Sequence, residues 1–149
     1  MPAPILIAAS ALIVFGLGFA HLVLTFASDR FSPRDANLEE RLKWVSPKIS
    51  AETTLWNAAI GFHASHSLGA MLFGSIYAYL ALRHPGFLLA SDFLCTLGVV
   101  VLLAYLVLAR RYWFAVPFAA IALALAPLSR RNGPVTRLNP PTKSGVMSL

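Results

Sequence analysis

Four long apolar segments, separated by short charged or proline-containing breaks, constrain the fold of this chain more than any other feature. The first covers residues 4–27 and would rise roughly 36 Å as a helix, which exceeds the ~30 Å hydrocarbon core of a bilayer. The other three cover residues 55–82, 87–109 and 112–128. Because only helices and closed barrels satisfy their backbone groups in lipid, we predict an all-α protein, a four-helix transmembrane bundle. Four crossings would return the chain to the side on which it starts.

The composition agrees with a membrane protein. Hydrophobic residues make up 58% of the chain and charged residues 12%, whereas an ordinary soluble domain is roughly 45–50% apolar. The net charge of +6 and the pI near 10.1 are strongly basic. The basic residues, however, sit at the ends of the apolar segments, as they do in membrane proteins. We therefore expect the lipid bilayer as a partner and no binding of nucleic acid.

The longest break predicts the main extramembrane loop. It covers residues 28–54 and is rich in charged residues of both signs. Within it, residues 36–44 carry apolar side chains at helical spacing, a pattern that fits both a short amphipathic surface helix and a solvated loop. Ser50 and Thr54 are both good N-caps for the helix that follows.

The last segment and the tail complete the domain organisation. Residues 112–128 form the shortest segment, and Pro117 within it predicts a kink or a locally thinned bilayer. Residues 1–128 therefore form one transmembrane domain. Residues 129–149 contain Pro, Gly, Ser and basic residues without any period, and we expect a disordered basic tail there.

Charges near the segment ends bear on orientation. The side that holds both termini carries five basic residues with no acids among them, whereas the loop side mixes seven basic residues with five carboxylates. A count of Lys and Arg alone favours the opposite orientation, but the acid-free tail leads us to place both termini in the cytoplasm. Asp92 is expected to pair with Arg83 or Arg130, or to stabilise the start of its helix, rather than to relay protons.

Polar residues are concentrated in one stretch of the second segment. The sequence LWNAAIGFHASHSLGAMLFG, from Leu55 to Gly74, contains two histidines, an asparagine and two serines. Polar groups are costly inside a membrane, so they usually face protein or water. The small residues Gly61, Ser65 and Gly69 recur at every fourth position and predict a surface on which another helix packs closely.

The histidines of the first two segments are expected to meet. At about 100° per residue, His63 and His66 share one stripe of the second helix. His21 lies about 9 Å from the loop end of the first helix, and His63 lies about 12 Å from the same surface on the second. Tyr105 and Trp113 are expected at the same end of the bundle. The candidate ligand-binding residues are His21, His63, His66, Glu52, Trp56, Asn57 and Ser67, and the three histidines are also candidate metal ligands.

Three interpretations of this cluster remain open. The histidines are neutral and only support packing, as in a structural accessory subunit of a membrane complex without a catalytic site. Alternatively they hold haem or a metal, for which imidazole is a suitable ligand. In the third interpretation they line a pocket for a lipophilic or quinone-like molecule, with His63 or His66 forming hydrogen bonds or moving protons. The sequence contains no nucleotide loop or HExxH motif, so it decides neither an enzymatic activity nor whether the chain forms a homo-oligomer.

Two stretches resemble a known group of proteins. The pattern GFAHLVLTF from Gly18 to Phe26, followed by the stretch from Leu55 to Gly74, resembles a family of small four-span bacterial membrane proteins that has no assigned activity. The resemblance covers the first two segments and implies a four-helix fold in the bacterial inner membrane. It also implies a set of family-like positions, which are His21, Trp56, Gly61, Phe62, Ser65, His66, Ser67 and Gly69.

Overall fold

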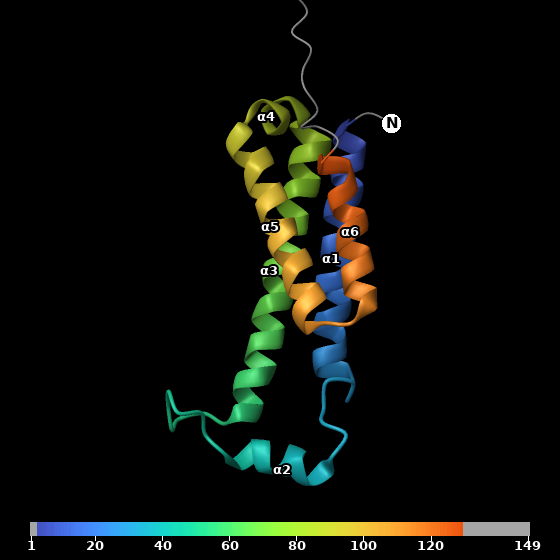
Figure 1. The fold of residues 1–149 in the computed structure, drawn as a ribbon. Helices are drawn as coiled ribbons and strands as arrows, with labels where there is room; N and C mark the ends of the chain where they lie inside the picture. Colours follow the sequence, from blue (N-terminus) through green and yellow to red (C-terminus); the bar gives the residue numbers. More distant parts are fainter. Residues whose placement is uncertain (1–2, 130–149) are drawn as a thin grey trace, which may run out of the picture.

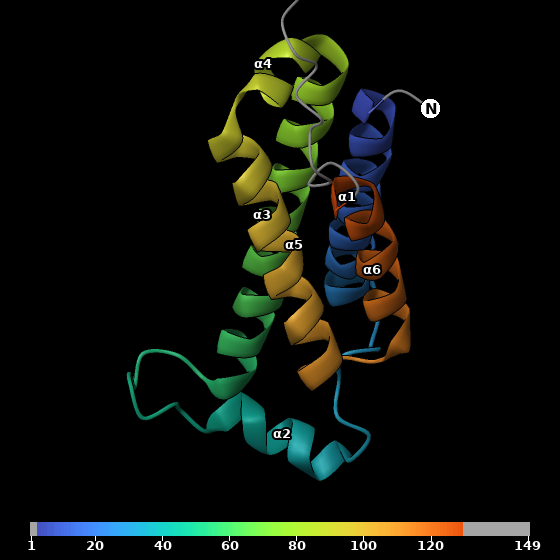
Figure 2. The same cartoon turned by 45° about the horizontal axis from the view of Figure 1, so that its top comes forward.

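The computed structural model describes residues 3–129, and no β-strand occurs among them. Four long helices run alternately in opposite directions (Figure 1). They are α1 (Ala3–Ala27), α3 (Leu55–Arg83), α5 (Asp92–Tyr112) and α6 (Ala115–Ser129). The short α2 (Ala36–Trp44) crosses one end of the bundle, and α4 (Pro85–Ala90) joins α3 to α5 at the other. The prediction of an all-α chain is confirmed, and α1 starts at the end of the bundle where α6 finishes (Figure 2).

Capping residues explain where α2 and α3 begin. The Asp35 side chain accepts hydrogen bonds from the backbone N–H groups of Asn37 and Leu38, and this fixes the first turn of α2. Of the two alternatives left open for this stretch, a short surface helix and a solvated loop, the helix is the one that forms. Thr54 caps α3 by accepting from the backbone N–H of Asn57 at 3.2 Å. Of the two caps expected for this helix, Thr54 is the one used.

The third segment was predicted to cover residues 87–109, and its predicted start is wrong. The helix breaks at Ser91, whose hydroxyl accepts from the backbone N–H of Leu94 at 3.2 Å and caps α5. The preceding residues instead form α4, which begins at Pro85 because proline is favoured in a first helical turn. Asp92 is the first residue of α5, so its negative carboxylate stabilises the positive, N-terminal end of the helix dipole. Asp92 forms no ion pair with Arg83, and Arg130 lies outside the described residues.

The last segment also differs from the prediction at its start. Tyr112 completes α5, and α6 begins only at Ala115. Pro117 therefore falls in the first turn of α6, where its missing N–H costs no helical hydrogen bond, so the expected kink does not arise. At 15 residues α6 is the shortest of the four long helices, as predicted. The predicted tail, residues 129–149, lies outside the described residues beyond Ser129.

Small residues bring α1 and α3 together. A Cβ atom added at Gly18 would lie 2.8 Å from the Ser67 carbonyl oxygen. One added at Gly74 would lie 2.6 Å from the Ala11 carbonyl oxygen. Both are closer than real Cβ contacts, so only glycine permits the observed helix separation at these positions. Close approach of backbones through small residues is the usual way in which membrane helices associate.

The ridge predicted to pack against another helix faces outward instead. Gly61, Ser65 and Gly69 are exposed, and no atom lies within 4 Å of a Cβ added at Gly61 or Gly69. The prediction fails within residues 3–129 because α3 carries two stripes of small residues on different faces. The stripe that contains Gly74 and Ala70 is the buried one.

Larger side chains fill the space between α3 and α5. The buried Tyr77 hydroxyl donates a hydrogen bond to the Leu94 carbonyl oxygen at 2.7 Å. The Tyr77 ring lies against Gly98, where an added Cβ would be 2.9 Å from Cε1. On the other side of the bundle, α6 packs on both α1 and α5. Tyr77 is therefore the main polar tie between α3 and α5.

Tyr77→Phe tests this tie. We expect the free energy of unfolding to fall by about 1 kcal/mol, because the ring is retained and one buried hydrogen bond is lost. Tyr79→Phe is the matched control, since Tyr79 is exposed and its hydroxyl lies 3.3 Å from His84 Nε2. Unfolding in mixed micelles with increasing SDS measures both variants. An equal loss in both would show that the Tyr77–Leu94 bond does not hold α5 in place.

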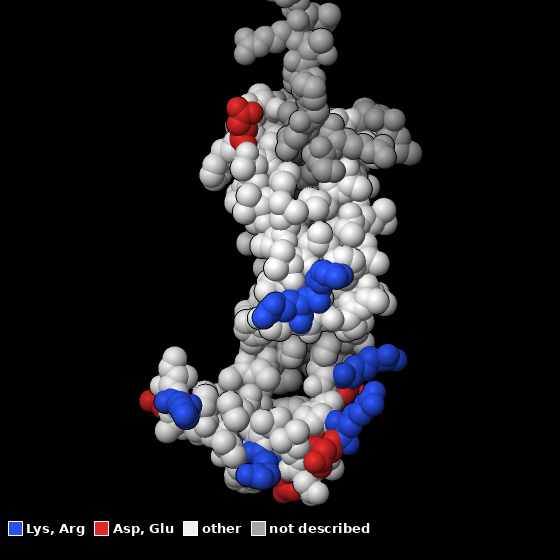
Figure 3. All heavy atoms as spheres, viewed as in Figure 1, with Lys and Arg blue, Asp and Glu red and all other residues white. Residues whose placement is uncertain are grey.

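Two of the long helices are apolar enough to cross a membrane. These are α1, with a mean hydropathy of 2.3, and α5, with 2.4. In Figure 3 the charged side chains gather on α2, on its flanking loop and at the end of α5, while most of the bundle surface above them is uncharged. On the face shown, most charged side chains thus lie toward α2, and the flank above them is uncharged apart from an acidic group near the opposite end.

Candidate functional site

The three histidines meet at the end of the bundle nearest to α2. His21 Nε2 and His63 Nδ1 are 3.0 Å apart, within hydrogen-bonding distance. The His66 ring centroid lies 5.7 Å from that of His21 and nearly perpendicular to it. The predicted meeting of the histidines is therefore confirmed. In the His21–His63 contact, one imidazole donates its N–H and the other accepts with its lone pair.

Hydroxyl groups one turn along each helix bond to the backbone carbonyl groups of His21 and His63, not to their rings. The Thr25 hydroxyl donates to the His21 carbonyl oxygen at 2.8 Å, one turn along α1. The fully buried Ser67 hydroxyl donates to the His63 carbonyl oxygen at 2.8 Å. Such bonds satisfy hydroxyl groups within their own helix. Ser67, a predicted ligand-binding residue, is thus packed between α3 and α1 with its hydroxyl already bonded.

Aromatic rings surround the imidazoles. Phe31, in the loop after α1, stacks on His63 with ring centroids 4.9 Å apart, and it lies 4.5 Å from His21. The His66 ring makes edge-type contacts with two further rings. Its centroid lies 5.6 Å from that of Tyr105 in α5 and 5.2 Å from that of Trp113 in the α5–α6 turn. We call these six residues the histidine–aromatic cluster. It joins three segments that are distant in the sequence.

Four of the predicted residues lie outside this cluster, and Ser67, described above, is one of them. Glu52 and Asn57 are exposed. Trp56 lies beneath the Lys43 ammonium group of α2, which is 5.0 Å from the centre of its ring. At a rise of ~1.5 Å per residue, Trp56 and Asn57 precede His63 by roughly two turns of α3. The stripe of α3 that carries His63 and His66 therefore continues past the cluster toward α2.

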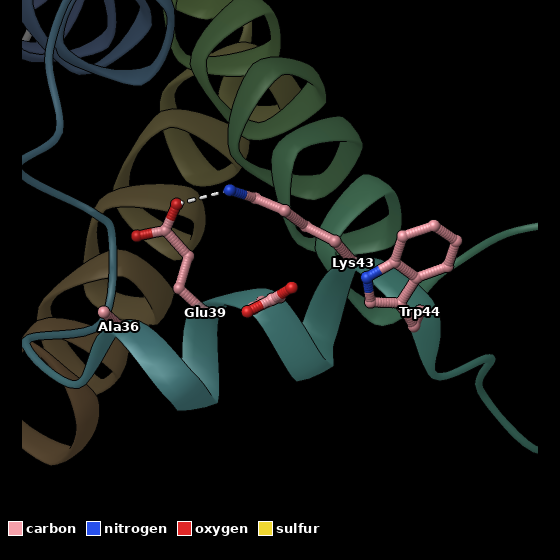
Figure 4. A pocket seen from close by; sticks show the side chains of 5 residues that line it. Ala36, Glu39, Lys43 and Trp44 are labelled. Carbon is pink, nitrogen blue, oxygen red and sulfur yellow. Dashed lines mark hydrogen bonds and ion pairs between the residues drawn. The ribbon is translucent and has the colours of Figure 1, made fainter.

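A hollow beside α2 is separate from the histidines. It has a volume of about 530 Å³ and is lined by five residues of that helix, Ala36, Glu39, Glu40, Lys43 and Trp44. Figure 4 shows the Lys43 ammonium group bonded to the Glu39 carboxylate. Lys43 Nζ lies 2.6 Å from Glu39 Oε1. This hollow is open, and an ion pair already occupies part of its wall. The histidines instead contact one another and the aromatic rings directly.

The arrangement of the imidazoles bears on the haem and metal interpretation. Within residues 3–129, no group of three or more His, Cys, Asp or Glu side chains is placed to hold a metal ion. In the His21–His63 contact, the lone pair of the accepting nitrogen is already used by a hydrogen bond. When neutral, the donating ring keeps a free lone pair on its other nitrogen, so the contact leaves one imidazole nitrogen of the pair able to bind a metal. The haem and metal interpretation stays a prediction.

Comparisons of the chain with protein-family models, curated proteins and solved structures find no match. The fold and the cluster define a helical-bundle protein with two helices apolar enough to cross a membrane. The resemblance of its first two segments to four-span bacterial membrane proteins stays a prediction.

Proposed function

We propose that α1, α3, α5 and α6 all cross the bacterial inner membrane, with both termini in the cytoplasm. The apolar outer surface supports this proposal, because the described residues leave large side chains such as Phe62 (70% exposed) and Phe93 (73% exposed) mostly uncovered. A lipid environment covers such side chains at no cost. The 29 residues of α3 rise roughly 43 Å, enough to cross the core and extend beyond it.

The end of α5 marks the membrane surface in this arrangement. Arg110 and Arg111 lie in the last turn of α5, next to Tyr112, Trp113 and Phe114. Cationic and aromatic residues together are typical of the membrane–water interface. Because Trp113 contacts His66, the histidine–aromatic cluster lies at this interface. A molecule dissolved in the bilayer reaches this depth without entering water.

We infer that the cluster binds a lipophilic or quinone-like ligand. The observation that carries this inference is the set of three imidazoles in contact, walled by Phe31, Tyr105 and Trp113. A neutral imidazole N–H donates to a ligand carbonyl, and aromatic faces stack on a planar ring. A histidine costs more free energy inside a membrane than Leu or Ala would at the same position. A packing role alone therefore explains poorly why three histidines meet.

The experiment is native mass spectrometry of the detergent-purified chain, with extraction and identification of the molecules that leave with it. We expect a lipophilic molecule at a fixed stoichiometry, and an absorption spectrum without a Soret band. A Soret band would assign the histidines to haem. A ligand-free protein that also fails to bind an added decyl-substituted benzoquinone would leave the structural accessory role.

A further inference from the structure

Two arginines near the cluster have no carboxylate partner among residues 3–129. Arg110 and Arg111 are exposed at the end of α5, and the ion pair found within residues 3–129 joins Lys43 to Glu39 instead. The Arg110 guanidinium lies 6.0 Å from the centre of the Phe118 ring, and the Arg111 guanidinium lies 5.9 Å from that of Tyr112. Guanidinium groups that rest on aromatic rings keep their N–H donors directed to other partners.

Stabilisation of the helix end does not account for the pair. Cations in the last turn favour the negative end of a helix, but α3 meets this need with Arg83 alone. The two arginines of α5 differ from Arg83 in their surroundings. They stand two and three residues before Trp113, whose ring contacts both His66 and Tyr105. The end of α5 and the residue that follows it therefore supply both an aromatic side of the cluster and two cations.

An apolar surface continues from the cluster on the outside of the bundle. Phe62 stacks on His66 with ring centroids 6.4 Å apart and is largely exposed. Phe114, the residue after Trp113, is 65% exposed. In Figure 1, α3 continues past the ends of α5 and α6 toward α2. A hydrocarbon chain bound to this apolar surface would be shielded from water.

We infer, on the basis of the proposed function, that the ligand of the histidine–aromatic cluster is an amphiphile with an acidic headgroup, a phosphate or a carboxylate. Its anion pairs with Arg110 and Arg111, since guanidinium groups bind both anions through paired hydrogen bonds. The adjoining part of the molecule lies against His66 and Trp113. Its chain follows the apolar flank at Phe62.

The test uses Trp113 as a single fluorescent reporter. Trp44→Phe and Trp56→Phe remove the other two tryptophans, and the protein is reconstituted in vesicles of phosphatidylcholine. Quenching of Trp113 by brominated phosphatidic acid is compared with quenching by brominated phosphatidylcholine, so that general contact with lipid cancels. We expect a roughly tenfold preference for phosphatidic acid, which Arg110→Gln with Arg111→Gln removes and Arg83→Gln retains.

Further measurements distinguish an anionic lipid from a soluble anion. They also distinguish failure of the acidic-headgroup inference from failure of the proposed function. A preference that persists in added inorganic phosphate supports recognition of the whole amphiphile. Loss of the preference on adding inorganic phosphate would assign the arginines to a soluble anion and overturn the inference. Equal quenching by both lipids would also overturn it. Binding of the neutral benzoquinone, measured separately, tests the proposed function without involving the arginines.

Discussion

His66→Leu is expected to weaken binding of the lipophilic ligand by roughly tenfold or more, the equivalent of one hydrogen bond to the ligand. Leucine fills a similar volume but has no polar atom. His66 is the centre of the aromatic wall, in contact with Tyr105 and Trp113 as well as with His21. The loss should therefore appear in affinity, while the bundle stays folded. Titration with the decyl-substituted benzoquinone measures it.

The matched control for this variant is His84→Leu. His84 is exposed at the opposite end of α3, where its ring lies 3.3 Å from the Tyr79 hydroxyl. We expect unchanged binding in this variant. His21→Leu adds a second comparison, because it leaves a nitrogen of His63 without its present partner. Unchanged binding in both His66→Leu and His21→Leu would show that the histidines are structural.

Gly74→Val is expected to destabilise the bundle by roughly 3 kcal/mol or more. A side chain at this position meets the Ala11 carbonyl oxygen at 2.6 Å and the Phe15 backbone nitrogen at 2.8 Å. Both are backbone atoms of α1, which cannot turn aside as a flexible side chain would. The two helices must separate, and the contacts along their whole interface weaken. The cluster should loosen as well, since His21 and His63 belong to the same pair of helices.

Gly69→Val provides the comparison, because no atom lies within 4 Å of a Cβ added there. Both substitutions place the same residue in the interior of α3, so their helix propensities cancel. Unfolding in SDS mixed micelles gives the difference between them. A small difference would mean that α1 and α3 do not pack through Gly74. A larger loss in Gly69→Val would indicate that the outward ridge is covered by another protein chain.

The helices were largely predictable from the sequence, but not their packing faces. Long apolar segments separated by charged breaks suffice to predict α1, α3, α5 and α6, because each segment shows the length of a membrane helix. The start of α5 was missed, since Ser91 lies inside an apolar run and its capping role depends on a local hydrogen bond. Periodicity also could not decide between Gly61 and Gly74, because both lie in stripes of small residues.

The candidate site was predictable where helical depth alone determines it. His21 and His63 lie at similar distances from the loop on antiparallel helices, and they do meet. Phe31 was missed because the path of the chain after α1 places it over the histidines, and no spacing rule describes that path. Trp56 follows the same stripe as His63, but α2 lies across the end of the bundle and Lys43 covers it instead.

Cysteine labelling in intact cells measures whether four crossings place the cluster and the chain termini at opposite faces of the membrane. Single cysteines replace Asn37 in α2, Arg111 at the end of α5 and Arg83 at the end of α3, with Cys95 changed to serine. A membrane-impermeant maleimide should label positions 37 and 111 from outside, and position 83 only after the membrane is opened. Labelling of positions 37 and 83 from the same side would show that α3 does not cross the membrane.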